Sequence, residues 1–131
     1  MIFADTSFWI AWRNGRDPRH AEATGLLQRV DTPILTTNHV RGETWTYLRR
    51  KVGHAAAVQF LDVLERSPRV SVRAVSPQQE AEALTWLRQH DEREYSFVDA
   101  TSFATMRRLR IDRALAFDGD FAAAGFVELR S

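Results

Sequence analysis

The sequence contains no cysteine, which excludes disulfides, zinc–thiolate sites and thiol nucleophiles. A fold without disulfides is stabilised by burial alone, which suits the reducing cytoplasm, and we expect the protein there. Residues 1–12 read MIFADTSFWIAW, with Asp5 interrupting the apolar run and no basic segment before it, unlike a signal peptide. No apolar run approaches the length of a membrane span, so no membrane association is expected.

Net charge is also low, because 18 basic and 17 acidic residues leave +1 at pH 7. This balance does not by itself indicate a nucleic acid partner. Lysine is nearly absent, since Lys51 is the one lysine. Arginine is the better partner for phosphate oxygens, although a GC-rich genome produces the same bias. The 131 residues, 44% of them hydrophobic, fit a single domain over 1–131.

Apolar periodicity and turn residues predict strands that alternate with helices. Strands are expected at 2–4, 33–37, 70–75, 114–117 and 126–129. Helices are expected at 17–30, 38–52, 54–66, 76–90 and 96–110, with caps at Asp17, Asn38, Ser76 and Ser96. This alternation is typical of an α/β fold, in which helices cover both faces of a parallel sheet.

Four acidic residues from distant parts of the chain are expected at one edge of this sheet. Asp5 and Asp118 follow the first and fourth strands directly. Glu43 and Asp99 lie in the first turns of two of the expected helices. The carboxyl ends of parallel strands and the helix N-termini after them share one edge, where ligands bind. Each acid alone is equally typical of a cap or a turn, so the inference depends on the four together.

Apolar spacing places two of these acids on the inward sides of their helices. Glu43 comes three residues after Val40, and Asp99 comes four residues before Phe103. Buried carboxylates are costly unless they are paired, protonated or neutralised by a cation. Helix N-termini contribute only about 0.3–1 kcal/mol each. With no cysteine available, an all-oxygen site favours Mg²⁺ or Mn²⁺ over zinc.

The motifs around the acids resemble those of the PIN-domain nucleases, in the same order and over nearly the whole chain. They are DTS at 5–7, GET at 42–44, SFVDATS at 96–102, and FDGDF at 117–121 before Gly125 and Phe126. Within that superfamily the chain is similar to the VapC toxins of bacterial toxin–antitoxin operons. Residues 94–126 are similar to VapC toxins that cut a structured ribosomal RNA loop.

The resemblance implies a three-layer α/β/α fold with a sheet of four to five strands. It implies an Mg²⁺- or Mn²⁺-dependent endoribonuclease that inhibits translation. The implied metal-binding and catalytic acids are Asp5, Glu43, Asp99 and Asp118, with Asp120 as an additional candidate ligand and Thr6 or Ser7 orienting the site. The implied partners are an RNA, a VapB-type antitoxin and a second copy of the chain. Operator DNA is expected to be contacted only through the antitoxin.

The expected substrate is one folded loop, because a net charge of +1 gives little attraction to random RNA. The resemblance favours the sarcin–ricin loop of 23S rRNA, with a tRNA anticodon loop as the second candidate. Arg13, Arg16 and Arg41 are candidates for binding the RNA, although they are equally typical of a solvated helix surface. The alternative is a PIN domain without a toxin role, either an RNA-processing nuclease or an inactive binding scaffold.

Overall fold

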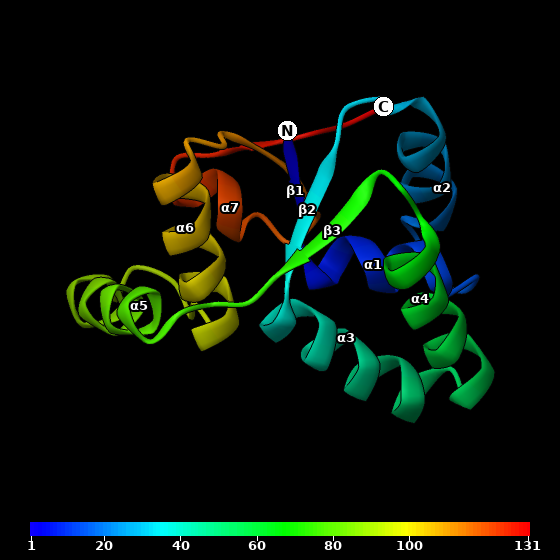
Figure 1. The fold of residues 1–131 in the computed structure, drawn as a ribbon, viewed down its shortest axis with the longest axis horizontal. Coiled ribbons are helices and arrows are strands. Elements are labelled where there is room, and N and C mark those ends of the chain that lie inside the picture. Colours follow the sequence, from blue (N-terminus) through cyan, green and yellow to red (C-terminus); the bar gives the residue numbers. More distant parts are fainter.

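The computed structural model describes residues 1–131 as a parallel sheet between two groups of helices (Figure 1). The five strands are β1 (Ile2–Ala4), β2 (Ile34–Thr37), β3 (Val70–Arg73), β4 (Arg113–Leu115) and β5 (Val127–Glu128). They are all parallel and lie in the order β3-β2-β1-β4-β5. The register pairs Phe3 with Leu35 on one side and with Ala114 on the other. The predicted α/β class and five-stranded sheet are confirmed.

Seven helices accompany the sheet. They are α1 (Thr6–Arg13), α2 (His20–Arg29), α3 (Asn38–Lys51), α4 (His54–Arg66), α5 (Pro77–Gln89), α6 (Phe97–Leu109) and α7 (Asp120–Ala123). In Figure 1, α5, α6 and α7 lie on one side of the sheet, whereas α1, α2 and α4 lie on the other, with α3 below. None of these helices is long and apolar enough to cross a membrane.

The hydrophobic core lies on both faces of the sheet. Every residue of β1 and β2 is buried, as is typical of central parallel strands covered on both sides. On one face, Phe103 of α6 packs edge-on against Phe121 of α7, with ring centroids 4.8 Å apart. On the other, Trp9 of α1 packs against Phe60 of α4 at 5.6 Å. Phe121 also stacks on Phe3 of β1 at 6.0 Å, so this aromatic cluster links α6 and α7 to the central strand.

Two helices were not predicted, and one begins later than expected. Neither α1 nor α7 was expected, because they are short and directly continue strand-end motifs. The helix predicted from Asp17 begins instead at His20. The Asp17 side chain accepts a 2.8 Å hydrogen bond from Arg19 N, so it closes a turn before the helix.

The expected cap of α3 is shifted by one residue. Thr37 is the N-cap, since its Oγ1 accepts a hydrogen bond from Val40 N at 3.1 Å. Asn38 instead accepts a 2.9 Å hydrogen bond from Val75 N through Oδ1. It thereby ties the start of α3 to the segment after β3. The predicted capping residues Ser76 and Ser96 are confirmed for α5 and α6.

Candidate active site

Asp5 lies where β1 ends and α1 begins, and only 2% of its surface is exposed. As the N-cap of α1, its Oδ2 accepts hydrogen bonds from Ser7 N at 3.2 Å and from Ser7 Oγ at 2.8 Å. Ser7 Oγ also accepts a 3.0 Å hydrogen bond from Phe117 N. The cap therefore joins the end of β1 to the segment after β4 that carries Asp118.

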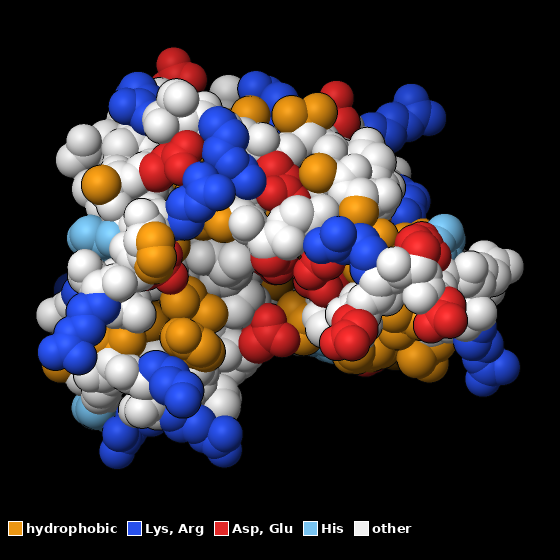
Figure 2. Space-filling view, turned by 180° about the vertical axis from the view of Figure 1, so that it is seen from behind, with side chains coloured by type: hydrophobic (Ala, Val, Ile, Leu, Met, Phe, Trp, Pro, Cys, Tyr) orange, Lys and Arg blue, Asp and Glu red, His pale blue; other side chains and the backbone are white.

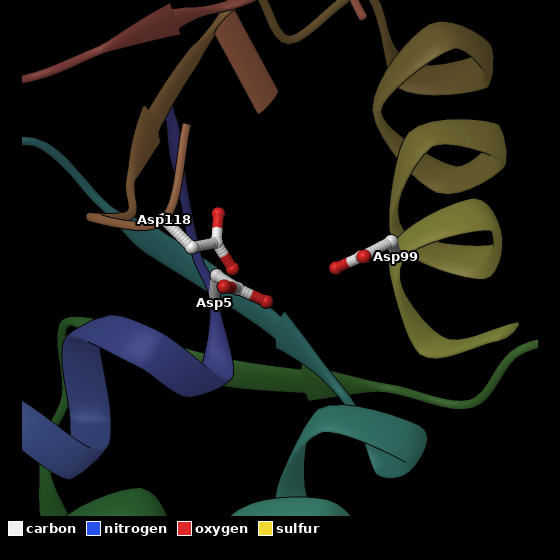
Figure 3. Close-up of side chains that lie close together, drawn as sticks. All are labelled: Asp5, Asp99 and Asp118. Carbon is white, nitrogen blue, oxygen red and sulfur yellow. The ribbon is translucent and has the colours of Figure 1, made fainter. Parts of the chain in front are cut away.

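Asp99 is held by a capping box at the start of α6. Ser96 Oγ accepts a hydrogen bond from Asp99 N at 2.9 Å, and Asp99 Oδ2 accepts one from Ser96 N at 3.0 Å. This reciprocal pair fixes the side chain in the first turn of the helix. Figure 3 shows the carboxylate pointing from α6 across the strand ends toward Asp5 and Asp118.

Asp118 lies in a tight turn after β4. Its Oδ1 accepts a 3.1 Å hydrogen bond from Asp120 N, and Gly119 between them has a φ of 83°. Only glycine adopts that conformation without strain. The turn directs the carboxylate of Asp118 toward Asp5 (Figure 3).

The three aspartates form one cluster, in which a carboxylate oxygen from each lies within 4.8 Å of the others (Figure 3). Burial raises the pKa of Asp5 well above its usual value, and the nearby charges of Asp118 and Asp99 raise it further. Burial also raises the pKa of Asp99 to about 6 and raises the pKa of Asp118. Crowded carboxylates of this kind share protons or bind a cation. An all-carboxylate donor set fits a hard divalent ion such as Mg²⁺ or Mn²⁺.

Glu43 lies outside this cluster, and its predicted inward orientation is wrong. The buried row of α3 consists of Val40, Thr44 and Leu48, whereas Glu43 is exposed. Tyr47, the next residue on the expected stripe, is 39% exposed. The row that faces the core contains the polar residue Thr44, so apolar spacing alone selected the wrong side of the helix.

Asp120 also lies outside the cluster, and its carboxylate pairs with Arg93. Arg93 Nε donates a 2.9 Å hydrogen bond to Asp120 Oδ1, and Arg93 Nη2 donates to the backbone oxygen of Asp118 at 3.3 Å. The sequence gives no sign of this contact, because 91–95 looks like an ordinary polar loop. Arg93 is the site residue that sequence reasoning missed.

The remaining predicted site residues differ in their surroundings. Thr6 is buried beside Asp5, and its Oγ1 has no hydrogen-bond partner. Arg13 is half-buried, donates a hydrogen bond to Gln59 and lies over the ring of Trp12. Arg16 and Arg41 are exposed. In Figure 2, acidic side chains gather near the middle of the face shown, and Lys and Arg lie mostly toward its margins.

Residues 2–127 match the PIN domain. This chain belongs to the PIN domain family. It is 55% identical over 130 residues to the 23S rRNA-specific endonuclease VapC20 of Mycobacterium tuberculosis. The match covers 99% of this chain and 98% of that relative. The predicted resemblance to PIN-domain nucleases and to VapC toxins is thus confirmed.

Solved structures show the same PIN fold. The crystal structure of Mycobacterium tuberculosis VapC20, a sarcin–ricin loop cleaving toxin, superposes with a TM-score of 0.95 at 53% identity, covering 100% of both chains. FitAcB from Neisseria gonorrhoeae matches with a TM-score of 0.68 over 98% of this chain and 96% of that chain. At 14% identity, the second match shows the shared fold alone.

Proposed function

We propose that this chain is a VapC-type endoribonuclease toxin that cleaves the sarcin–ricin loop of 23S rRNA and so inhibits translation. The observation that carries this is the 55% identity to a 23S rRNA-specific endonuclease over 99% of the chain. Coverage is nearly complete in both directions, so the similarity spans all the segments that carry the three aspartates. Shape-dependent recognition of one loop also agrees with a net charge of only +1.

We infer that Asp5, Asp99 and Asp118 hold the divalent ion, Mg²⁺ or Mn²⁺. Their oxygens converge within 4.8 Å. A divalent ion in such a site lowers the pKa of a bound water and offsets charge on the phosphate oxygens. Each ligand accepts a hydrogen bond from a neighbour: Asp5 from Ser7, Asp99 from Ser96, and Asp118 from the backbone N–H of Asp120.

Two further residues complete the proposed machinery. Thr6 Oγ1 is buried and has no partner in the protein, so it is free to donate a hydrogen bond to a group bound beside Asp5. Glu43 is proposed as the fourth acid that cleavage requires. Glu43 is exposed and lies outside the cluster. We therefore propose that it acts once RNA is bound, and that it is not needed to bind a divalent ion in the absence of RNA.

The acidic cluster also defines how the proposed toxin is restrained. A VapB-type antitoxin inhibits by placing an arginine or lysine against the three aspartates, where a charge-assisted hydrogen bond is strong. We further propose that the chain acts in the cytoplasm as a homodimer and contacts operator DNA only through that antitoxin. A bound antitoxin that left the acidic cluster open would contradict this mode of inhibition.

Induction of the chain in cells, followed by mapping of new RNA 5′ ends, tests the proposed function. We expect one dominant cut, in the sarcin–ricin loop of 23S rRNA, with Asp99→Asn as the inactive control. In vitro, changes to the loop sequence that leave its stem paired should remove the cut. A cut in tRNA anticodon loops favours the second candidate, and many scattered cuts in messenger RNA contradict both.

A further inference from the structure

Arg93 forms hydrogen bonds with both ends of the 118–120 turn, which carries Asp118. Its Nε pairs with Asp120 Oδ1 at 2.9 Å, and its Nη2 reaches the backbone oxygen of Asp118 at 3.3 Å. These two contacts use two different nitrogens of one planar guanidinium, which a lysine ammonium cannot reproduce. The turn is therefore bound to the loop before α6, 25 to 27 residues earlier in the chain.

Gly119 lets the turn lie close to this guanidinium. A Cβ at Gly119 would come within 3.3 Å of Arg93 Nη2, and the φ of 83° is unfavourable for any other residue. Asp120 is the less exposed partner of the ion pair, with 19% of its side chain accessible against 41% for Arg93. The carboxylate of Asp120 forms an ion pair with Arg93, and it lies outside the cluster of three aspartates.

We propose that Arg93 is a positioning residue, which holds the 118–120 turn so that Asp118 faces Asp5 and Asp99 while Asp120 stays out of the metal site. The inference deepens the proposed function, since it concerns the same three-aspartate site. It assigns Asp120 to Arg93 rather than to the ion. It also predicts that Arg93 and Asp120 act as one unit.

The test compares Arg93→Ala, Arg93→Lys, Asp120→Asn and the double variant Arg93→Ala/Asp120→Asn. Arg108→Ala is the matched control, because Arg108 also pairs with one carboxylate, Glu82, and its side chain is 40% exposed. Mn²⁺ binding without RNA is titrated by electron paramagnetic resonance. Cleavage is measured as kcat on whichever RNA the wild-type protein cuts, and folding is monitored by Tm.

We expect Arg93→Ala and Asp120→Asn each to lower kcat about tenfold, in the range typical of residues that orient metal ligands. The double variant should be no slower than the slower single variant, because the two changes break one interaction. Arg93→Lys should recover only part of the rate. Asp120→Asn should weaken Mn²⁺ binding no more than Arg93→Ala does, because both changes act on the cluster only through the position of Asp118, and Arg108→Ala should match the wild type in both measurements.

Two results overturn the proposal. If Asp120→Asn weakens Mn²⁺ binding about tenfold or more beyond the effect of Arg93→Ala, Asp120 is itself a ligand. If Arg93→Ala cleaves as fast as Arg108→Ala, the turn does not need Arg93. Failure of the proposed substrate is a separate outcome, because a wild-type protein that cuts another RNA leaves the Mn²⁺ titration and the comparison of variants intact.

Discussion

Ser7 and Phe117 lie 110 residues apart in the sequence, yet Phe117 N donates a 3.0 Å hydrogen bond to Ser7 Oγ. The same hydroxyl donates to Asp5 Oδ2 at 2.8 Å. One side chain thus sets the position of Asp5 and of the chain directly before Asp118. The two aspartates follow the neighbouring strands β1 and β4, so this link adds to the strand pairing that already brings the two segments together.

We expect Ser7→Ala to lower the cleavage rate about ten- to a hundredfold, as loss of a residue that orients a metal ligand does. The backbone N–H of Phe117 would lose its partner, which lowers the free energy of unfolding by about 1–3 kcal/mol. Thr105→Ala is the control, because it removes a buried hydroxyl-to-carbonyl bond within α6 without contacting the aspartates. Equal cleavage by the two variants would contradict the role of Ser7.

Replacing Asp5, Asp99 or Asp118 with asparagine should abolish Mn²⁺ binding and lower cleavage more than about a hundredfold. The fold should survive, because asparagine keeps an oxygen that accepts the capping hydrogen bonds of Asp5 and Asp99. Without metal, these variants should have a higher Tm than the wild type, since one of several crowded charges is gone. Near-normal cleavage by Asp5→Asn or Asp99→Asn would refute the assignment.

The variant Glu43→Gln tests whether Glu43 has a different role from the three clustered aspartates. It should remove cleavage yet leave Mn²⁺ binding in the absence of RNA close to that of the wild type, because Glu43 is exposed and outside the cluster. The two measurements are made on the same preparation, with Asp99→Asn as the variant that fails both. Loss of Mn²⁺ binding in Glu43→Gln would place Glu43 among the first ligands.

The extent to which this site could be predicted depends on how local its signals are. Asp99 follows Ser96 by three residues, and a capping box is encoded within those four positions. The buried side of α3 could not be predicted in this way. Residues three apart, such as Val40 and Glu43, and residues four apart, such as Val40 and Thr44, both lie on the same side of a helix. The contact of Arg93 with Asp120 spans 27 residues and depends on how the loop before α6 meets the turn after β4. No local pattern encodes that approach.

The pKa of Asp99, raised to about 6 by burial, predicts how stability changes with pH in the metal-free protein. The folded state keeps this proton up to a higher pH than the unfolded state, whose carboxyl titrates near 3.8. The contribution to stability is therefore full below about pH 4 and is lost as pH rises to about 6. The Tm of the metal-free wild type, compared with that of Asp99→Asn at the same pH, should fall between pH 4 and pH 7. Excess Mn²⁺ should reverse this trend, because protons compete with the ion below about pH 6.

The final prediction concerns the arginines proposed to contact RNA. Arg16 and Arg41 are exposed, so each can neutralise a phosphate, whereas Arg13 is already held by Gln59 and Trp12. Replacing Arg16 or Arg41 with alanine should raise KM, leave kcat unchanged and lower the slope of log KM against log salt by about 1. Arg113→Ala is the matched control, because Arg113 is exposed at the start of β4, at the opposite end of that strand from Asp118. An unchanged salt slope in Arg16→Ala and Arg41→Ala would remove both from the RNA-binding surface, and a lower slope in Arg113→Ala would show that the effect is one of net charge alone.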